Sequence, residues 1–239
     1  MTFIPNVKVL ARKIKTGDML SSARGISILE DDFSSGKKLI GILKRGKAPN
    51  AFIVGVTGSA GSGKSTLIAA LAELARNHRK KVAVVAVDPS SAKHGGAFLG
   101  DRVRMQKLAE DSGVFIRSMA SRGARGGVAQ ATQGAAFLLA CAGYDYVFIE
   151  TIGAGQLDDA VTRIARVTLF LLTPESGDEL QFIKAGLAEE ADVFVVNKAD
   201  RPGAEQMAHV LAKDGRPVFK TKAEEKKGIE PLWRFLERF

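Results

Sequence analysis

A glycine-rich segment of this sequence has the residue types and spacing needed to bind a triphosphate. It reads Gly58-Ser59-Ala60-Gly61-Ser62-Gly63-Lys64-Ser65-Thr66, a G-x-x-x-x-G-K-S loop that follows a β-branched run and precedes a helical pattern. Glycines let the backbone curl so that its N–H groups point at phosphate oxygens. Lys64 is expected to reach the β- and γ-phosphates, and the Ser65 hydroxyl to bind Mg²⁺. The alternative is that this segment only connects a strand to a helix, a role that requires neither the Lys64 nor the Ser65 side chain.

A second segment has the chemistry to select a guanine base. Asn197-Lys198-Ala199-Asp200 follows a short apolar run, and Thr221-Lys222-Ala223 follows the last one. The Asp200 carboxylate can accept hydrogen bonds from the ring N–H and the exocyclic amine of guanine, whereas adenine offers one suitable donor. The Lys198 stem can lie along the base, and residues 221–223 could donate a backbone N–H to the guanine oxygen. Helix capping by Asp200 is the alternative, but together with the phosphate loop the pattern indicates GTP.

Three acidic residues are candidates to hold Mg²⁺ together with Ser65. Asp88 and Glu150 each end an apolar run, and Asp101 lies in a glycine-rich segment between them. Nucleotide-bound Mg²⁺ keeps waters and takes few protein carboxylates, so not all three can be direct ligands. Asp88 and Asp101 could instead be helix N-caps.

The elements that must position these residues follow from the apolar pattern. Short apolar runs without polar alternation predict strands covered on both faces, and helical patterns such as 65–77 and 128–141 supply the covers. The expected fold is therefore an α/β P-loop NTPase with a mostly parallel, doubly wound sheet over residues 49–239. Residues 1–48 are polar and basic, with helical periodicity, and predict a small N-terminal helical appendage. The expected strands span 52–56, 82–87, 114–117, 146–150, 167–172, 193–197 and 218–221.

Composition excludes several classes of protein. The chain of 239 residues has one cysteine, Cys141, which rules out an intrachain disulfide or a cysteine-based zinc cluster. No apolar run approaches the roughly 20 residues of a membrane helix, so we expect a soluble, cytoplasmic protein. The net charge of +9 is compatible with nucleic acid, an acidic protein partner or an ordinary solvated surface.

By these motifs the chain resembles the MeaB/ArgK family of metallochaperone-type P-loop GTPases, chaperones of adenosylcobalamin-dependent methylmalonyl-CoA mutase. The resemblance covers essentially the whole chain. Besides the phosphate loop, it rests on Ala86-Val87-Asp88-Pro89-Ser90-Ser91, Leu99-Gly100-Asp101-Arg102, Ser121-Arg122-Gly123, Glu150-Thr151, Gly153, Gly155-Gln156, Gly177-Asp178-Glu179-Leu180-Gln181 and Val196-Asn197-Lys198-Ala199-Asp200.

The resemblance implies three nucleotide-dependent switch segments, at about 88–104, 150–159 and 174–184. In the family the third switch carries the GTPase state to the mutase, and Asp178, Gln181 and Lys184 are the positions expected to do so here. The implied function is a chaperone that binds and hydrolyses GTP, and protects, loads or reactivates an adenosylcobalamin-dependent acyl-CoA mutase. From the residues alone, Asp178 could be a helix N-cap followed by surface residues.

Hydrolysis requires an aligned water and charge compensation as the γ-phosphoryl group leaves. Lys64 and Mg²⁺ supply the compensation, and Asp88, Gln156 and the Gly153 N–H are the candidates to position the water. We expect slow turnover by the protein alone, because a GTPase whose site is completed by a partner behaves as a timer.

Two features depart from the family. Where the family reads Gly-Gln-Ser-Glu, this chain has Gly155-Gln156-Leu157-Asp158-Asp159, which bears on the second switch. Only 39 residues follow Asp200, so the helical arm with which many relatives dimerise is expected to be missing.

Other functions are less consistent with the residues. A nickel-insertion GTPase would need imidazole or thiolate ligands close together, but His78, His94 and His209 are scattered and Cys141 lies on an apolar helix pattern. A nucleic-acid-binding NTPase would interleave aromatics with its basic residues, and aromatics are sparse, so no nucleic acid is expected. The basic cluster Lys37-Lys38, Lys44-Arg45 and Lys47 reads as a solvated face, with a phosphate-facing patch as the alternative. A small-molecule kinase lacks a recognisable lid or acceptor pocket.

Overall fold

A seven-stranded parallel sheet forms the centre of the computed structural model, which describes residues 6–46, 49–88, 105–120, 127–151, 159–175 and 191–239. The strand order is β3-β2-β4-β1-β5-β6-β7, and each neighbouring pair is parallel. All the predicted strands are confirmed, and so is the doubly wound α/β class. The strands are β1 Phe52–Gly58, β2 Val82–Asp88, β3 Val114–Ala120, β4 Tyr146–Thr151, β5 Val167–Leu172, β6 Val193–Val196 and β7 Val218–Lys220.

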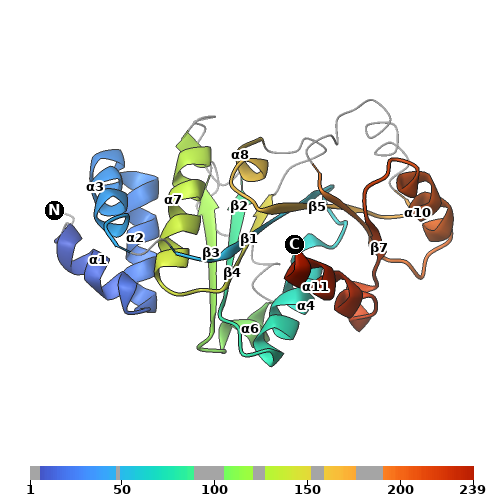
Figure 1. Ribbon diagram of the computed structural model, residues 1–239, viewed down its shortest axis with the longest axis horizontal. Helices are drawn as coiled ribbons and strands as arrows, with labels where there is room; N and C mark the ends of the chain where they lie inside the picture. Colours follow the sequence, from blue (N-terminus) through green and yellow to red (C-terminus); the bar gives the residue numbers. More distant parts are fainter. Residues whose placement is uncertain (1–5, 47–48, 89–104, 121–126, 152–158, 176–190) are drawn as a thin grey trace.

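Helices cover both faces of this sheet (Figure 1). Alternate residues of a strand face opposite ways, so Val54 and Val56 of β1 enter one core with α4 and α11, while Ile53 packs against the other core with α7. A third cluster lies between β5, β6 and α10. The described helices that follow β1 in the chain are α4 Lys64–Asn77, α6 Gln106–Ala109, α7 Gly127–Cys141, α8 Asp159–Thr162, α10 Ala204–Ala212, the 3₁₀ turn η1 Ala223–Glu225 and α11 Ile229–Arg238.

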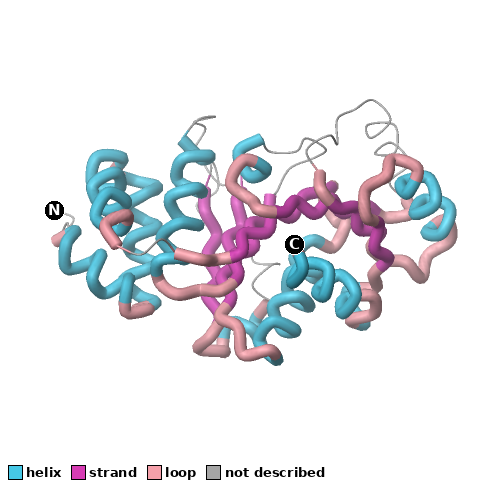
Figure 2. Tube along the Cα trace, viewed as in Figure 1, coloured by secondary structure: helices cyan, strands magenta, loops and turns pink. Residues whose placement is uncertain are grey.

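Three helices precede the sheet: α1 Val7–Lys15, α2 Met19–Asp31 and α3 Phe33–Leu43. The side chains of Asn6, Asp18 and Asp32 cap them, each accepting a backbone N–H of the first turn. The three helices stand beside α7 (Figure 2) and bury Ile14, Ile26 and other apolar residues in the same cluster as β2, β4 and α7. They thus share a core with the sheet, and the predicted boundary at residue 48 stays a prediction.

An ion pair also ties these helices to the sheet. Arg117 of β3 donates to the Glu30 carboxylate and to the Ser27 hydroxyl of α2, each at 3.0 Å. The Glu30 side chain is only 7% exposed, and little solvent screens the pair on that side. The pair therefore fixes α2 against the edge strand in addition to apolar packing.

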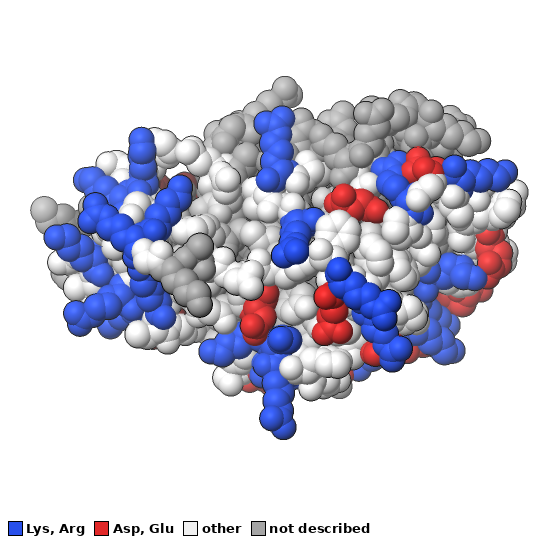
Figure 3. All heavy atoms as spheres, viewed as in Figure 1, with Lys and Arg blue, Asp and Glu red and all other residues white. Residues whose placement is uncertain are grey.

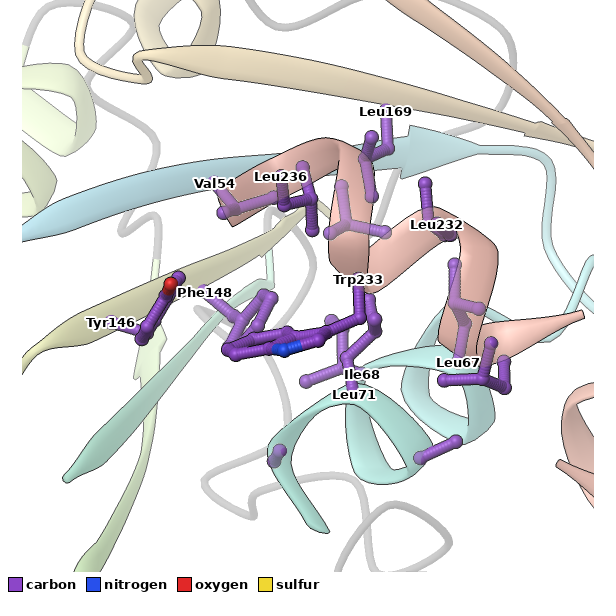
Figure 4. Packing of buried hydrophobic residues seen from close by; sticks show 14 of the residues in the cluster. Val54, Leu67, Ile68, Leu71, Tyr146, Phe148, Leu169, Leu232, Trp233 and Leu236 are labelled. Carbon is purple, nitrogen blue, oxygen red and sulfur yellow. The ribbon is translucent and has the colours of Figure 1, made fainter. Parts of the chain in front are cut away.

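The C-terminal helix α11 is held by the single tryptophan of the chain. Trp233 is completely buried, with its ring centre 4.7 Å from that of Tyr146 and 5.9 Å from that of His78. Figure 4 shows the indole between β4 and α4, with Leu232 and Leu236 on the same helix turned into the core. This apolar face agrees with the packing role predicted for Trp233. None of the helices described here is long and apolar enough to span a bilayer.

Removing the indole should destabilise the protein strongly. Trp233→Ala is expected to lower the free energy of unfolding by about 3–5 kcal/mol, because it loses buried area and leaves a cavity in a packed core. Denaturant unfolding followed by circular dichroism measures the change, since the substitution removes tryptophan fluorescence.

Trp233→Phe is the matched control. It keeps an aromatic ring, and it breaks no hydrogen bond to the described residues, among which the indole Nε1 has no partner. It should cost clearly less than Trp233→Ala. Equal losses in the two variants would mean that the ring does not hold α11 in place.

Candidate nucleotide-binding site

The glycine-rich loop joins the end of β1 to the start of α4, and three of its glycines have positive φ. The values are 138° for Gly58, 78° for Gly61 and 94° for Gly63, a region that costs other residues energy. A Cβ at Gly58 would stand 2.3 Å from the carbonyl oxygen of Leu171, and one at Gly63 would stand 2.3 Å from Asn197 Nδ2. Two of the glycines therefore allow close approach to β5 and to Asn197, while Gly61 has open space around its Cα.

Lys64 lies inside this loop. Its ammonium donates to the carbonyl oxygens of Gly58 at 2.7 Å and of Ser59 at 2.8 Å, and the residue is buried. Helix α4 begins at Lys64, and Gly63 provides no side-chain cap for it. The first-turn N–H groups and the ammonium together favour an anion at this position. Of the remaining predicted phosphate contacts, Ala60 is exposed at the rim and Thr66 is half-buried in the first turn.

Two predicted magnesium ligands, 85 residues apart in sequence, meet beside the loop. The Ser65 hydroxyl on α4 donates to Glu150 Oε1 at the end of β4, at 2.7 Å, and both residues are buried. Paired hard oxygen donors suit Mg²⁺, which takes its other ligands from phosphates and water. The residues present thus fit the ion, although among the described residues no three His, Cys, Asp or Glu side chains gather. Asp88 ends β2 at the same sheet edge, and its side chain is not described.

A neighbouring pair of buried hydroxyls was not anticipated from the sequence. Thr151 Oγ1 donates to Thr57 Oγ1 at 3.1 Å, joining the ends of β4 and β1 directly behind the loop. Both residues lie at the ends of apolar strands, and threonine is common in strands. Their positions in the sequence therefore did not indicate that the two hydroxyls would form a hydrogen bond.

Asn197 connects the phosphate loop to the predicted base-recognition segment. Its Nδ2 donates to the Ser62 carbonyl oxygen at 2.8 Å, across 135 residues of sequence. Its Oδ1 accepts from the Thr221 hydroxyl at 3.0 Å and from the Ala223 N–H at 3.2 Å. One buried amide thereby fixes three segments at the carboxyl edge of the sheet, with most of its hydrogen-bonding capacity in use.

Asp200 lies at the open side of this arrangement. Its carboxylate is 46% exposed and is 3.2 Å from the Lys222 ammonium. A hydrogen bond from its own backbone N–H, and then the one from Lys222, hold the pKa of the Asp200 carboxyl below its ordinary value. The carboxylate therefore stays ionised through the neutral range, as acceptance of two guanine donors requires. Lys198 next to it has a φ of 55°, a left-handed conformation unusual for a side-chain-bearing residue.

Glu225 is a site residue that sequence reasoning missed. It pairs with Lys222 and, at 2.8 Å, with Lys227. The Lys222 hydrogen bond, followed by that of Lys227, lowers the pKa of Glu225 to about 2. Its i,i+3 spacing from Lys222 was the available signal. The pairing holds Lys222 between two carboxylates, one of which is Asp200.

The backbone N–H groups proposed for the guanine oxygen are already used within the protein. Those of Thr221, Lys222 and Ala223 donate to Val196 O, Lys227 O and Asn197 Oδ1, at 2.9, 3.0 and 3.2 Å. A guanine contact from residues 221–223 would have to share one of these bonds. The predicted contact stays a prediction.

The remaining predicted residues lie outside the described part of the chain. These are Asp101 for the metal, Gly153 and Gln156 for the water, and Asp178, Gln181 and Lys184 for partner coupling.

A family model described as "Methylmalonyl Co-A mutase-associated GTPase MeaB" matches residues 23–239. The chain belongs to the MeaB family. A Pyrococcus abyssi protein named as a GTPase is 42% identical to it over 96% of this chain and 76% of the relative. The Caenorhabditis elegans "Methylmalonic aciduria type A homolog, mitochondrial" is 39% identical over 82% of this chain and 53% of that protein. MeaB-family membership therefore assigns the chain to the P-loop GTPases, in agreement with its strand–loop–helix geometry.

Solved structures share the fold. The crystal structure of an LAO/AO transport system kinase superposes with a TM-score of 0.79 at 27% identity, covering 97% of this chain and 74% of that one. The nickel complex of HypB from Helicobacter pylori gives a TM-score of 0.58 at 19% identity, covering 91% and 94%. The latter similarity shows the fold alone.

Substitution of Gly63 tests the contact between the loop and Asn197. Gly63→Ala should lower the free energy of unfolding by more than about 2 kcal/mol, because it adds a left-handed alanine and forces Asn197 away. Gly61→Ala also places an alanine at positive φ, but its methyl group meets no neighbouring atom. It should lower the free energy of unfolding by about 1 kcal/mol. Denaturation without nucleotide measures both. Equal losses would show that the approach to Asn197 contributes nothing.

Substitution of Asp200 tests base recognition. Asp200→Asn should weaken GTP binding about tenfold to a hundredfold and favour xanthosine triphosphate, because an amide replaces one acceptor by a donor. Titration with fluorescent nucleotide analogues gives the two affinities. Glu225→Gln keeps the Asp200 carboxylate and should retain the preference for GTP. If Asp200→Asn bound GTP as tightly as the wild type, the assignment would be wrong.

Proposed function

We propose that this protein is a GTP-hydrolysing chaperone of an adenosylcobalamin-dependent acyl-CoA mutase of the methylmalonyl-CoA mutase type. The observation that carries the proposal is the Asn197 amide, which joins the phosphate loop to the segment predicted to recognise guanine, in a MeaB-family chain. The family description names methylmalonyl-CoA mutase, and a relative is named for methylmalonic aciduria. Protection, loading or reactivation of the mutase is the activity we assign.

In this proposal GTP lies with its phosphates in the loop and its base at Asp200. Lys64 exchanges its loop carbonyl partners for β- and γ-phosphate oxygens and balances the charge of the leaving phosphoryl group. Ser65 and Glu150 would hold Mg²⁺, which would supply further charge compensation. Asp88, Gln156 and the Gly153 N–H are the candidates to orient the attacking water, and their assembly by a partner would make turnover slow in its absence.

Coupling to the mutase is assigned to residues 174–184, with Asp178, Gln181 and Lys184 as the contact positions. Loss of the γ-phosphate would alter the order of the switch segments, which is how related switches convert nucleotide state into partner affinity. The mutase would in turn accelerate or restrain hydrolysis, since equilibrium coupling between two sites is reciprocal.

Nickel insertion is the competing function. Of the candidate ligands within the described residues, Cys141 is half-buried on α7, and burial raises the pKa of its thiol, which disfavours the thiolate that metals bind. His78 is exposed at the C-terminal end of α4, where its ring stacks on that of Trp233. Among the described residues no three His, Cys, Asp or Glu side chains gather, which disfavours a nickel site.

The decisive experiment measures GTP turnover with and without a purified adenosylcobalamin-dependent methylmalonyl-CoA mutase, and in parallel the survival of mutase activity during turnover. We expect slow hydrolysis alone, a changed rate with the mutase, and slower mutase inactivation when the GTPase and GTP are present. Fast hydrolysis that no acyl-CoA mutase affects would refute the proposal.

The metal site has its own test. Ser65→Ala should raise the Mg²⁺ concentration for half-maximal GTP hydrolysis by about tenfold or more, because it removes an oxygen ligand and the partner of Glu150. Ser65→Thr retains a hydroxyl and should behave like the wild type. A Mg²⁺ requirement unchanged in Ser65→Ala would exclude Ser65 as a ligand.

A further inference from the structure

The outer faces of α1 and α3 form one strongly cationic surface, which we call the cationic face. Helix α1 contributes Lys8, Arg12, Lys13 and Lys15. Helix α3 contributes Lys37 and Lys38, followed directly by Lys44 and Arg45. All eight are exposed, and neither helix contains an acidic residue. Lys15 Nζ donates to the Arg45 carbonyl oxygen at 2.8 Å, which holds the ends of the two helices together.

Charge elsewhere on the molecule is arranged differently. Arg76, Lys226 and Arg234 are each paired with a carboxylate, and so is Lys222 at the nucleotide site. No residue of the cationic face makes an ion pair with any residue that the structure describes. Figure 3 shows the contrast: blue side chains crowd the N-terminal end, with hardly any red, while the two colours mix toward the other end. Residues 6–46 hold nine Lys or Arg against four Asp or Glu, so they carry a net +5 of the chain's total of +9.

Apolar side chains are also exposed on the three N-terminal helices. Of the large hydrophobic residues exposed in the described part of the chain, Val9, Met19, Leu20 and Phe33 belong to α1–α3, with Leu20 at 76% and Phe33 at 64% exposure. Val9 stands one turn before Arg12 and Lys13, and Phe33 one turn before Lys37. Arginine and aromatic residues among polar ones are typical of protein interfaces.

We propose that the cationic face docks an acidic surface of the partner mutase, an inference that rests on the proposed function. A protein partner fits better than a membrane, because the apolar faces of α1 and α3 are already buried in the core and cannot enter lipid. It also fits better than single-stranded RNA, since Phe33 is the single aromatic exposed on α1–α3 and such binding depends on stacking.

The attachment of this surface suits a docking role. The Arg117 to Glu30 ion pair and the shared core hold α2 against β3 and α7, and α1 and α3 bury apolar residues such as Ile14 and Leu39 in the same core. A partner bound to the cationic face would consequently be held in a fixed orientation to the sheet edge that carries the nucleotide. Long-range attraction would speed the encounter and be screened by salt, with a Debye length of about 10 Å at 0.1 M.

The test combines three charge reversals on the cationic face, Arg12→Glu, Lys37→Glu and Lys44→Glu, chosen because none of these side chains donates to another described residue. Affinity for purified adenosylcobalamin-dependent methylmalonyl-CoA mutase is measured at low and at physiological salt. We expect the triple variant to bind about tenfold or more weakly at low salt, with a shallower salt dependence. GTP affinity and turnover without the mutase should match the wild type.

A control with the same change in net charge reverses three exposed cations on other elements, Lys81→Glu, Lys213→Glu and Arg238→Glu. It should bind the mutase within about twofold of the wild type. Equal affinities in the two triple variants would overturn the docking surface and leave the proposed function standing. A wild-type protein that binds no mutase in any nucleotide state would overturn both. Binding of phosphatidylserine vesicles or single-stranded RNA more tightly than the mutase, lost in the first variant, would assign the surface to that partner instead.

Discussion

The nucleotide site depends on one buried amide, that of Asn197. It bonds to the backbone of the phosphate loop and to two groups of the 221–223 segment, so three loops from β1, β6 and β7 share one anchor. Leaving either end of a buried amide without a partner costs free energy. If one loop moved and the other two did not, Asn197 would lose a hydrogen bond. The phosphate end and the base end of the site are therefore positioned as a unit.

Glycine makes this anchoring possible. Gly58 lets the loop pass against the Leu171 carbonyl on β5, and Gly63 lets it pass against Asn197. The strands β1, β5 and β6 are neighbours in the sheet, so their carboxyl ends deliver the loop, its support and its anchor side by side. On the other flank β4 delivers Glu150 to Ser65. The sheet and the site are thus in direct contact at Gly58 and Gly63, where there is no space for a side chain.

Much of this could be predicted from the sequence. β-branched apolar runs such as 193–196 predicted their strands because burial on both faces admits no polar alternation, and the spacing of Gly58, Gly63 and Lys64 predicted the loop. What could not be predicted are contacts that depend on how strands are ordered: which of the three candidate carboxylates bonds to Ser65, the pairing of Thr57 with Thr151, and the use of the 221–223 N–H groups within the protein. Sequence spacing carries no information about which strands become neighbours, and Asn197 gave no sign that it bridges to Ser62.

The lone, fully buried tryptophan has a spectroscopic consequence. Indole emission depends on the polarity around the ring, so all of the tryptophan fluorescence of this protein reports one location, the junction of β4, α4 and α11. Because α4 begins at Lys64, any nucleotide-driven displacement of that helix changes the surroundings of Trp233. The fluorescence of Trp233 can therefore report movements of the phosphate loop without any added label. The loop leads into the N-terminal end of α4, and Trp233 contacts His78 at the C-terminal end of that helix.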